Sequence, residues 1–330
     1  MKTRQQLLSN PELLRDKARG ALIGLAIGDS FGDAARTPDN QMAYGITADF
    51  NKGASWSTDD TEFALLTANT LIGCGGKLTA DAVCEAWLTH VATQDELKRG
   101  GASEFEASRN LRKGLRAPLS GRYNSYCHSD GAAMRISPIG VLCAGDVPAA
   151  IEMAAIDASI SHDREGVWGA QSVAAAVAAA MADGTMEEIL EAAMLPIPQD
   201  TWFRYAMERA FHIVDEAKGD LLLAWMPLHD ELWTSYKASV CEAVAEAFGI
   251  LKLVHGDFRT GVVYAGNFGR DADTIGAICG AVLGAKFGHS AIPPIWAEKP
   301  RYPSGTCLPF TKGLDILKVA DSLTDLILQK

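Results

Sequence analysis

The sequence lacks the features that mark several large functional classes. Its seven cysteines form no Cys-x-x-Cys pair and are odd in number, so we expect buried reduced thiols rather than a disulfide framework. The net charge is −11, and no run of Lys and Arg forms a local basic patch. Such a chain would repel a nucleic-acid backbone, so we do not expect nucleic-acid binding. There is no Gly-x-Ser-x-Gly elbow, Walker loop or Rossmann fingerprint, so serine-hydrolase and nucleotide-loop chemistry find no support.

Long hydrophobic runs are also missing. Residues 1–19 are polar and contain no apolar core of a secretory signal. Residues 173–182 are apolar but rich in alanine, and they are shorter than the ~20 residues of a membrane span. With 48% apolar and 22% charged residues, the composition is typical of a globular protein. We therefore expect a soluble, cytoplasmic protein with no membrane segment.

Alternating runs of β-branched residues are scarce, whereas apolar residues at helical spacing are frequent. No linker is long or of low complexity, so we predict one all-α domain spanning residues 1–330, with a closing helix over 311–330. The other predicted helices span residues 13–27, 61–72, 80–93, 149–159, 168–182, 187–193, 202–217, 235–254 and 274–287.

Glycine recurs every four residues in two of these helices. The first row is Gly20, Gly24 and Gly28, and the second runs from Gly276 to Gly288. This spacing places the glycines on one helix face, where they permit close backbone approach. Each glycine costs ~1 kcal/mol inside a helix, so a compensating contact is expected. We predict tight packing of two central helices around a shared site, although simple close packing without a site would also explain the glycines.

Two acidic clusters carry the strongest functional signal. Each places two carboxylates and at least one hydroxyl within four or five residues, just before an apolar helical run. Oxygen ligands of this kind suit Mg²⁺, Mn²⁺ or Ca²⁺. N-capping is the alternative interpretation, but it accounts for one residue per helix and not for two carboxylates twice. The clusters are Ser57-Thr58-Asp59-Asp60-Thr61 and Asp271-Ala272-Asp273-Thr274.

Three further segments allow either a functional or a structural interpretation. Gly131 could let the backbone approach a ligand, and Arg135 could pair with a phosphate or simply form a structural ion pair. His162 precedes a predicted helix and fits a cap better than a catalytic dyad. Asp29 follows the first glycine row as either a supporting acid or a loop residue.

In order along the chain, these segments resemble the ADP-ribosylglycohydrolases. This family includes dinitrogenase-reductase-activating glycohydrolase and the ADP-ribosyl-arginine and ADP-ribosyl-serine hydrolases. Residues 20–29 are similar to its opening helix, and the acidic clusters to its two metal motifs. Residues 131–138 are similar to its central Met-Arg segment, and Ser161-His162 to a Thr/Ser-His helix start.

The resemblance implies an all-α orthogonal helical bundle with two Mg²⁺ ions, or Mn²⁺, that bind the ribose diol and position a water molecule. Its substrate would be an ADP-ribosylated protein or a small ADP-ribose derivative, cleaved at C1″ through an oxocarbenium-like state. The implied metal ligands are Thr58, Asp59, Asp60, Asp271, Asp273 and Thr274. The candidate catalytic acids are Asp29, Asp33, Asp60 and Asp271. The candidate substrate-binding residues are Arg36, Asp130, Gly131, Met134, Arg135 and His162.

The sequence departs from the family pattern at two positions. Arg36 stands where members often have a glutamate, and Ser129-Asp130-Gly131 replaces a usual Gly-Asn-Gly. Both changes affect residues expected to face the substrate, so the leaving group could differ from arginine or serine. Two other functions stay open. A two-metal phosphoesterase or nucleotide hydrolase would use the same kind of centre, and Arg36 leaves room for a catalytically silent ADP-ribose-binding protein.

Overall fold

The structure, a computed structural model, describes residues 1–46, 48–50, 55–254 and 257–329. The prediction of an all-α fold is confirmed: these residues form helices α1 to α18 and short turns of other helix types. In the same ranges, extended pairing is limited to one bridge between Ser129 and Ser239. Their buried apolar side chains form a single core that extends from Leu7 to Ile327.

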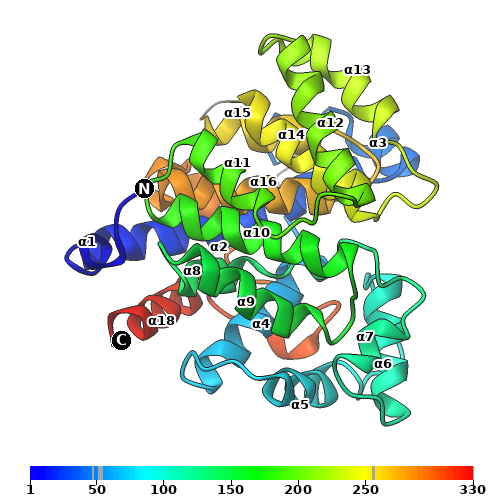
Figure 1. Cartoon of the computed structure of the whole chain (residues 1–330), viewed down its shortest axis with the longest axis vertical. Coiled ribbons are helices and arrows are strands. Elements are labelled where there is room, and N and C mark those ends of the chain that lie inside the picture. The colour runs from blue at the N-terminus through cyan, green and yellow to red at the C-terminus, as the bar shows by residue number, and fades with distance from the viewer. Residues whose placement is uncertain (47, 51–54, 255–256, 330) are drawn as a thin grey trace.

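The core is built around two antiparallel helices, α2 (Pro11–Asp33) and α16 (Ala272–Phe287), which cross the middle of the molecule (Figure 1). A Cβ atom on Gly24 would collide with the carbonyl of Gly280, and one on Gly28 with that of Gly276. Glycine therefore allows a backbone approach that no other residue permits here. This antiparallel contact brings the C-terminal end of α2 to the N-terminal end of α16.

Six further α-helices of six or more residues pack against one or both members of the central pair. Helix α10 crosses in front of the pair in Figure 1 and is rich in alanine, which keeps the packing close. Helix α4 also touches both, and its N-terminus meets the ends of α2 and α16. These helices are α4 (Asp59–Gly73), α8 (Ser137–Leu142), α10 (Glu165–Met181), α14 (Ala245–Val254), α15 (Phe258–Gly266) and α18 (Ile316–Leu328).

The remaining helices are peripheral or short. In Figure 1, α12 and α13 lie at one end of the molecule, and α5, α6 and α7 at the other. Their bounds are α1 (Arg4–Leu8), α3 (Pro38–Tyr44), α5 (Ala80–His90), α6 (Ala102–Arg112), α7 (Leu119–Arg122), α9 (Val147–Ala158), α11 (Met186–Met194), α12 (Trp202–Glu216), α13 (Leu221–Glu231), α17 (Pro294–Glu298), the π-helical η2 (Val240–Val244), and the 3₁₀ turns η3 (His289–Ala291) and η4 (Pro309–Thr311).

Each predicted helix overlaps an observed one, but three boundaries were wrong. The range 13–27 ends too early, because α2 continues to Asp33, and Asp29 is therefore a helical residue and not a loop residue. The range 235–254 becomes helical only at Val240, where Ser239 caps a π-helical turn that leads into α14. The range 311–330 is helical from Ile316, where Asp315 provides the N-cap, and Lys330 lies outside the described residues. Sequence periodicity missed α6, which is polar, and α13, which contains Pro227.

Two expectations from composition can be compared with the structure. All seven cysteines lie among the described residues and are free, and five of them are buried. Within the described ranges, no helix combines the length and the apolar character that crossing a membrane requires.

Candidate metal centre

The two acidic clusters meet at the junction of three helix ends. Thr58 precedes α4, Asp271 precedes α16, and the C-terminal turn of α2 supplies Asp29. Neither Thr58 nor Asp271 makes a side-chain cap hydrogen bond, although both occupy the N-cap position. N-capping therefore does not explain the clusters, and two helix N-termini direct their positive ends at the same place.

Three carboxylates form the centre of this junction. One oxygen from each of Asp59, Asp60 and Asp273 lies within 4.8 Å of the others, and all three side chains are buried. Asp60 Oδ1 and Asp273 Oδ1 have no hydrogen-bond partner in the described part of the chain. A buried acceptor without a partner is costly, so this arrangement fits a bound cation.

The electrostatics lead to the same conclusion. Burial raises the pKa of Asp59 and of Asp273 to about 7, and Arg36 opposes the shift in both cases. Burial, followed by the charges of Asp273 and Asp29, raises the pKa of Asp60 well above its ordinary value. Carboxylates this close cannot all remain ionised without a counter-charge. The all-oxygen donor set suits a hard divalent cation such as Mg²⁺ or Mn²⁺.

Asp29 holds the first cluster in place. Its carboxylate accepts hydrogen bonds from the Thr58 amide at 3.0 Å and from the Thr58 hydroxyl at 2.7 Å. It also accepts from the amide and the hydroxyl of Thr61. Burial raises the pKa of Asp29 to about 7. Its oxygens are thus engaged with the start of α4, and the Thr58 hydroxyl also lies 3.0 Å from Asp60 Oδ2.

Asp33, one turn further along α2, contacts side chains from other segments. Its Oδ2 atom accepts from Trp56 Nε1 at 2.6 Å and from Arg99 Nη1 at 2.9 Å. A cavity of about 230 Å³ opens beside it. The cavity is lined by Asp33, Asn40, Tyr44, Trp56, Ser57, Arg99, Ser304 and Thr306.

Asp271 is set apart from the other acids by two cations. Its Oδ1 atom lies 3.1 Å from Lys237 Nζ and 3.5 Å from Arg36 Nε. Although burial acts in the opposite direction, Arg36 and Lys237 hold the pKa of Asp271 below its usual range. Arg36 Nη1 also contacts Asp273 Oδ2. Thr274 is buried in the first turn of α16, next to Asp273.

The central segment lies against the same junction. Asp130 is buried, and burial together with the neighbouring Asp271 raises its pKa well above its ordinary value. The Asp130 amide donates to the Ala238 carbonyl at 2.9 Å. A Cβ atom on Gly131 would collide with Glu104 Oε1, so this glycine makes room for a carboxylate. Met134 is buried four residues after Asp130.

Arg135 and His162 form a buried polar network beneath the site rather than on its surface. Arg135 Nε donates to Asp157 Oδ1 at 2.9 Å, and its other nitrogens bind the Gly131 carbonyl and the Ser161 hydroxyl. The His162 ring is bound at Nδ1 by Ser161 and at Nε2 by Ser129. Burial lowers the pKa of His162 well below its ordinary value, so the ring is neutral. Direct contact with a substrate would require breaking these bonds.

Sequence reasoning missed Glu104 in the first turn of α6. The side chain is buried, Ser103 donates to its Oε2 at 2.9 Å, and Oε1 lies 3.7 Å from Arg135 Nη1. Burial raises its pKa, and Asp271 adds to the shift. The available signal was Gly100-Gly101 directly before this helix, because a Cβ on Gly101 would collide with Glu104 Oε2. Lys237, Trp56 and Arg99 carried no comparable signal.

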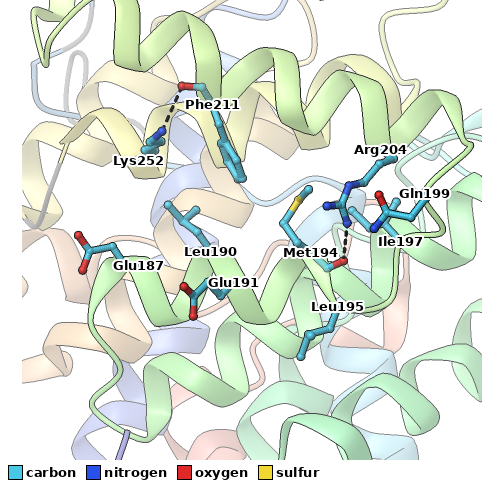
Figure 2. A pocket seen from close by; sticks show the side chains of 10 residues that line it. All are labelled: Glu187, Leu190, Glu191, Met194, Leu195, Ile197, Gln199, Arg204, Phe211 and Lys252. Atoms are coloured by element: carbon cyan, nitrogen blue, oxygen red, sulfur yellow. Dashed lines mark hydrogen bonds between the residues drawn. The ribbon is translucent and has the colours of Figure 1, made fainter.

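A larger cavity of about 700 Å³ lies away from this centre (Figure 2). It is bordered by α11, α12 and α14. Lys252 Nζ donates there to the Phe211 carbonyl, and Arg204 Nη1 to the Met194 carbonyl. None of its ten lining residues belongs to the acidic clusters or the central segment. We therefore place the candidate chemistry at the helix junction and not in this cavity.

Known proteins resemble this chain along most of its length. Residues 10–330 match the family model described as ADP-ribosylglycohydrolase. ADP-ribosylarginine hydrolase Tri1 of Pseudomonas putida is 26% identical over 300 residues, which cover 88% of this chain and 75% of that protein. ADP-ribosyl-dinitrogen reductase glycohydrolase of Rhodospirillum rubrum is 24% identical over 302 residues, with 87% and 90% covered. The solved structure of an ADP-ribosylglycohydrolase-related protein complex shares the fold, with a TM-score of 0.63 and 23% identity over 96% of this chain and 99% of that one.

Proposed function

Because this chain belongs to the ADP-ribosylglycohydrolase family, whose named homologues are hydrolases acting on glycosyl bonds, we propose that it is a divalent-metal-dependent glycohydrolase. Its substrate would be an ADP-ribosylated protein or a small ADP-ribosylated metabolite, cleaved at the ribose C1″ atom. The observation that carries this proposal is the buried group of Asp59, Asp60 and Asp273, in which carboxylate oxygens lack partners.

We assign the binding of two Mg²⁺ or Mn²⁺ ions to the two clusters. Asp59, Asp60 and Asp273 would supply carboxylate ligands, with Thr58, Asp271 and Thr274 completing the set. When bound, such ions supply Lewis-acid binding of the ribose diol and make water a better nucleophile. The N-termini of α4 and α16 would stabilise the ionised form of the carboxylates in their first turns.

The candidate catalytic acids divide by their contacts. Asp29 would act as a positioning residue, because its oxygens hold the start of α4. Asp33 would orient Trp56 and Arg99 at the edge of the neighbouring cavity. Asp60 and Asp271 remain the candidates for contact with the reacting atoms. Asp130, whose burial favours the protonated form, would be able to donate a hydrogen bond to the substrate.

The remaining substrate-binding candidates differ in how deeply their side chains are buried, and so in whether they could contact a substrate. Arg135 and His162 would support the central segment from below, since their nitrogens are bound to protein groups. Gly131 and Met134 would shape the wall above them. Arg36 is partly exposed and contacts the carboxylates themselves.

The decisive assay incubates the purified protein with Mg²⁺ and one of three substrates: ADP-ribosyl-arginine, ADP-ribosyl-serine or O-acetyl-ADP-ribose. Two relatives are named for arginine-linked or dinitrogen-reductase substrates, so ADP-ribosyl-arginine is tested first. The expected product is free ADP-ribose, and excess EDTA should abolish its release. Release of AMP or phosphate would favour the phosphoesterase, and binding without turnover would favour the silent ADP-ribose binder.

A further inference from the structure

The carboxylates of the centre outnumber the cations that touch them. Eight acidic side chains in and around the junction are buried, and Arg36 is the one cation among the described residues that contacts Asp273. Its guanidinium reaches Asp273 through Nη1 and Asp271 through Nε. Although burial works against its charge, Asp273 and Asp271 raise the pKa of Arg36 above its ordinary value, so it remains charged. The eight acids are Asp29, Asp33, Asp59, Asp60, Glu104, Asp130, Asp271 and Asp273.

Asp273 can therefore take part in two interactions that compete with each other, metal coordination and an ion pair. It belongs to the three-carboxylate group that fits a metal ion, and it is also the ion-pair partner of Arg36. A divalent cation and a guanidinium in contact with the same carboxylate repel each other, and this repulsion is strong where water is excluded. Arg36 contacts Oδ2 of Asp273, so coordination of a metal ion through both carboxylate oxygens requires the guanidinium to withdraw.

We propose that Arg36 is a built-in cation that competes with a divalent metal ion for Asp271 and Asp273. The inference rests on the proposed metal-dependent function and adds a regulatory contact to it. With Arg36 in place, the charges of Asp271 and Asp273 are balanced in part without metal. Metal binds fully only after Arg36 has moved away, so the measured metal affinity is lowered by the competition.

The surroundings of Arg36 make this exchange feasible. The residue lies in the short connection between α2 and α3, and its side chain is 26% exposed, whereas those of Asp271 and Asp273 are buried. Asp33 Oδ1 lies 4.0 Å from Arg36 Nη1 and offers a second carboxylate oxygen to receive the guanidinium. Lys237 stays 3.1 Å from Asp271 and keeps that acid paired when Arg36 leaves.

Titration calorimetry with Mn²⁺ on metal-free protein tests the competition directly. Arg36→Gln keeps a polar side chain but is shorter and carries no charge. It should therefore bind Mn²⁺ at least about tenfold more tightly than the wild type, the change produced by loss of a competing interaction of about 1.4 kcal/mol. Arg36→Lys, which retains a cation, should stay closer to the wild type. Arg122→Gln is the matched control: it removes one positive charge from an exposed side chain that pairs with Asp163, and its affinity should match the wild type.

Equal Mn²⁺ affinity in the wild type and Arg36→Gln would overturn the proposal. If Arg36→Gln does not fold without metal, crystals of the wild type with and without Mn²⁺ decide instead. Arg36 should leave Asp273 when Mn²⁺ binds, and a guanidinium still on Asp273 beside a bound Mn²⁺ would refute the competition. The proposed function fails by a different result: no release of ADP-ribose and no Mn²⁺ binding by either protein. Hydrolysis with unchanged affinity in Arg36→Gln would refute only the role of Arg36.

Discussion

At the scale of single residues, the aspartates of the centre have different roles because their side chains have different partners. Asp29 accepts four hydrogen bonds from two threonines and so serves the backbone of α4. Asp273 has an oxygen with no hydrogen-bond partner among the described residues and lies close to two other carboxylates. The environment, rather than the residue type, separates a positioning acid from a candidate metal ligand.

Replacing Asp273 by Asn should separate metal binding from folding. The amide keeps the size of the side chain but loses the negative charge that a hard cation needs. We expect Mg²⁺-dependent hydrolysis to fall more than about 100-fold, beyond the loss typical of groups that only support a metal ligand. The circular dichroism spectrum should be unchanged. Asp81→Asn, an exposed acid in the first turn of α5, is the control and should keep full activity; normal turnover in Asp273→Asn would contradict the ligand assignment.

Lys17 provides a second residue-scale prediction, on stability. Its buried ammonium donates to the Ala180, Ala285 and Lys286 carbonyls near the ends of α10 and α16, and it pairs with Asp183. Lys17→Met would remove this donor from all three carbonyls, of which Ala180 keeps a backbone hydrogen bond from the Asp183 amide. We expect a loss of about 3 kcal/mol in the free energy of unfolding, measured in urea.

The control for Lys17 is Lys2, which pairs with the same Asp183 from an exposed position. Lys2→Met should cost less than about 1 kcal/mol, because an exposed ion pair contributes little. Similar losses in the two variants would show that the carbonyl contacts of Lys17 do not stabilise the fold.

At the scale of elements, the packing of α2 against α16 sets the geometry of the centre. Glycines on both helices face each other in three pairs, where a Cβ would separate the backbones: Gly20 and Gly284, Gly24 and Gly280, and Gly28 and Gly276. The C-terminal acids of α2 therefore meet the first turn of α16. Helix α4 is linked to a distant segment in addition, because its buried Glu62 accepts hydrogen bonds from the Cys307 and Leu308 amides. The elements are thus held at their ends, near the candidate site.

Gly28→Ala should disrupt this helix pair. The added methyl would collide with the Gly276 carbonyl, a backbone atom that cannot move aside, one residue before Asp29. We expect a loss of about 3 kcal/mol in the free energy of unfolding and weaker metal binding. Gly73→Ala is the control, because its Cβ would meet nothing within 4 Å at the end of α4. Equal stability of the two variants would show that the close approach is not required.

At the scale of the whole molecule, the net charge of −11 is concentrated in part at the helix junction, where acids from α2, α4, α6 and α16 are buried together. Such a fold stores like-charge repulsion that a bound cation would relieve. Binding only to the folded state also stabilises it, by about 2.7 kcal/mol at 100 times the dissociation constant.

Thermal unfolding should therefore respond to Mg²⁺ or Mn²⁺. We expect the Tm to rise with metal concentration and to fall again with excess EDTA, as followed by circular dichroism. The same titration on Asp273→Asn should produce a much smaller shift, and Ca²⁺ tests the choice among hard cations. A Tm that does not respond to any of these ions would contradict a metal centre in this fold.

Much of the candidate site could be predicted because its signals are local. The metal motifs are contiguous, and the glycine rows follow the four-residue spacing of a helix face. Glu104 and Lys237 could not be found in this way, since both lie outside the acidic clusters and the glycine rows. Trp56 directly precedes the first cluster, but its contact with Asp33 joins segments that the sequence pattern does not relate. Arg135 was identified from the sequence, but its buried partners were not, because they lie on α9 and at Ser161.

The sequence by itself determined the all-α class, the helices with clear apolar periodicity and the two acidic clusters, because these depend on neighbours within one or two helical turns. Only the tertiary structure decided which acids converge: the antiparallel register of α2 and α16 brings Asp29 and Asp33 to the start of α16. It also decided that Arg36 contacts Asp271 and Asp273 rather than solvent alone. Long-range packing and the repulsion among buried charges select these contacts, and neither can be read from residues close together in the chain.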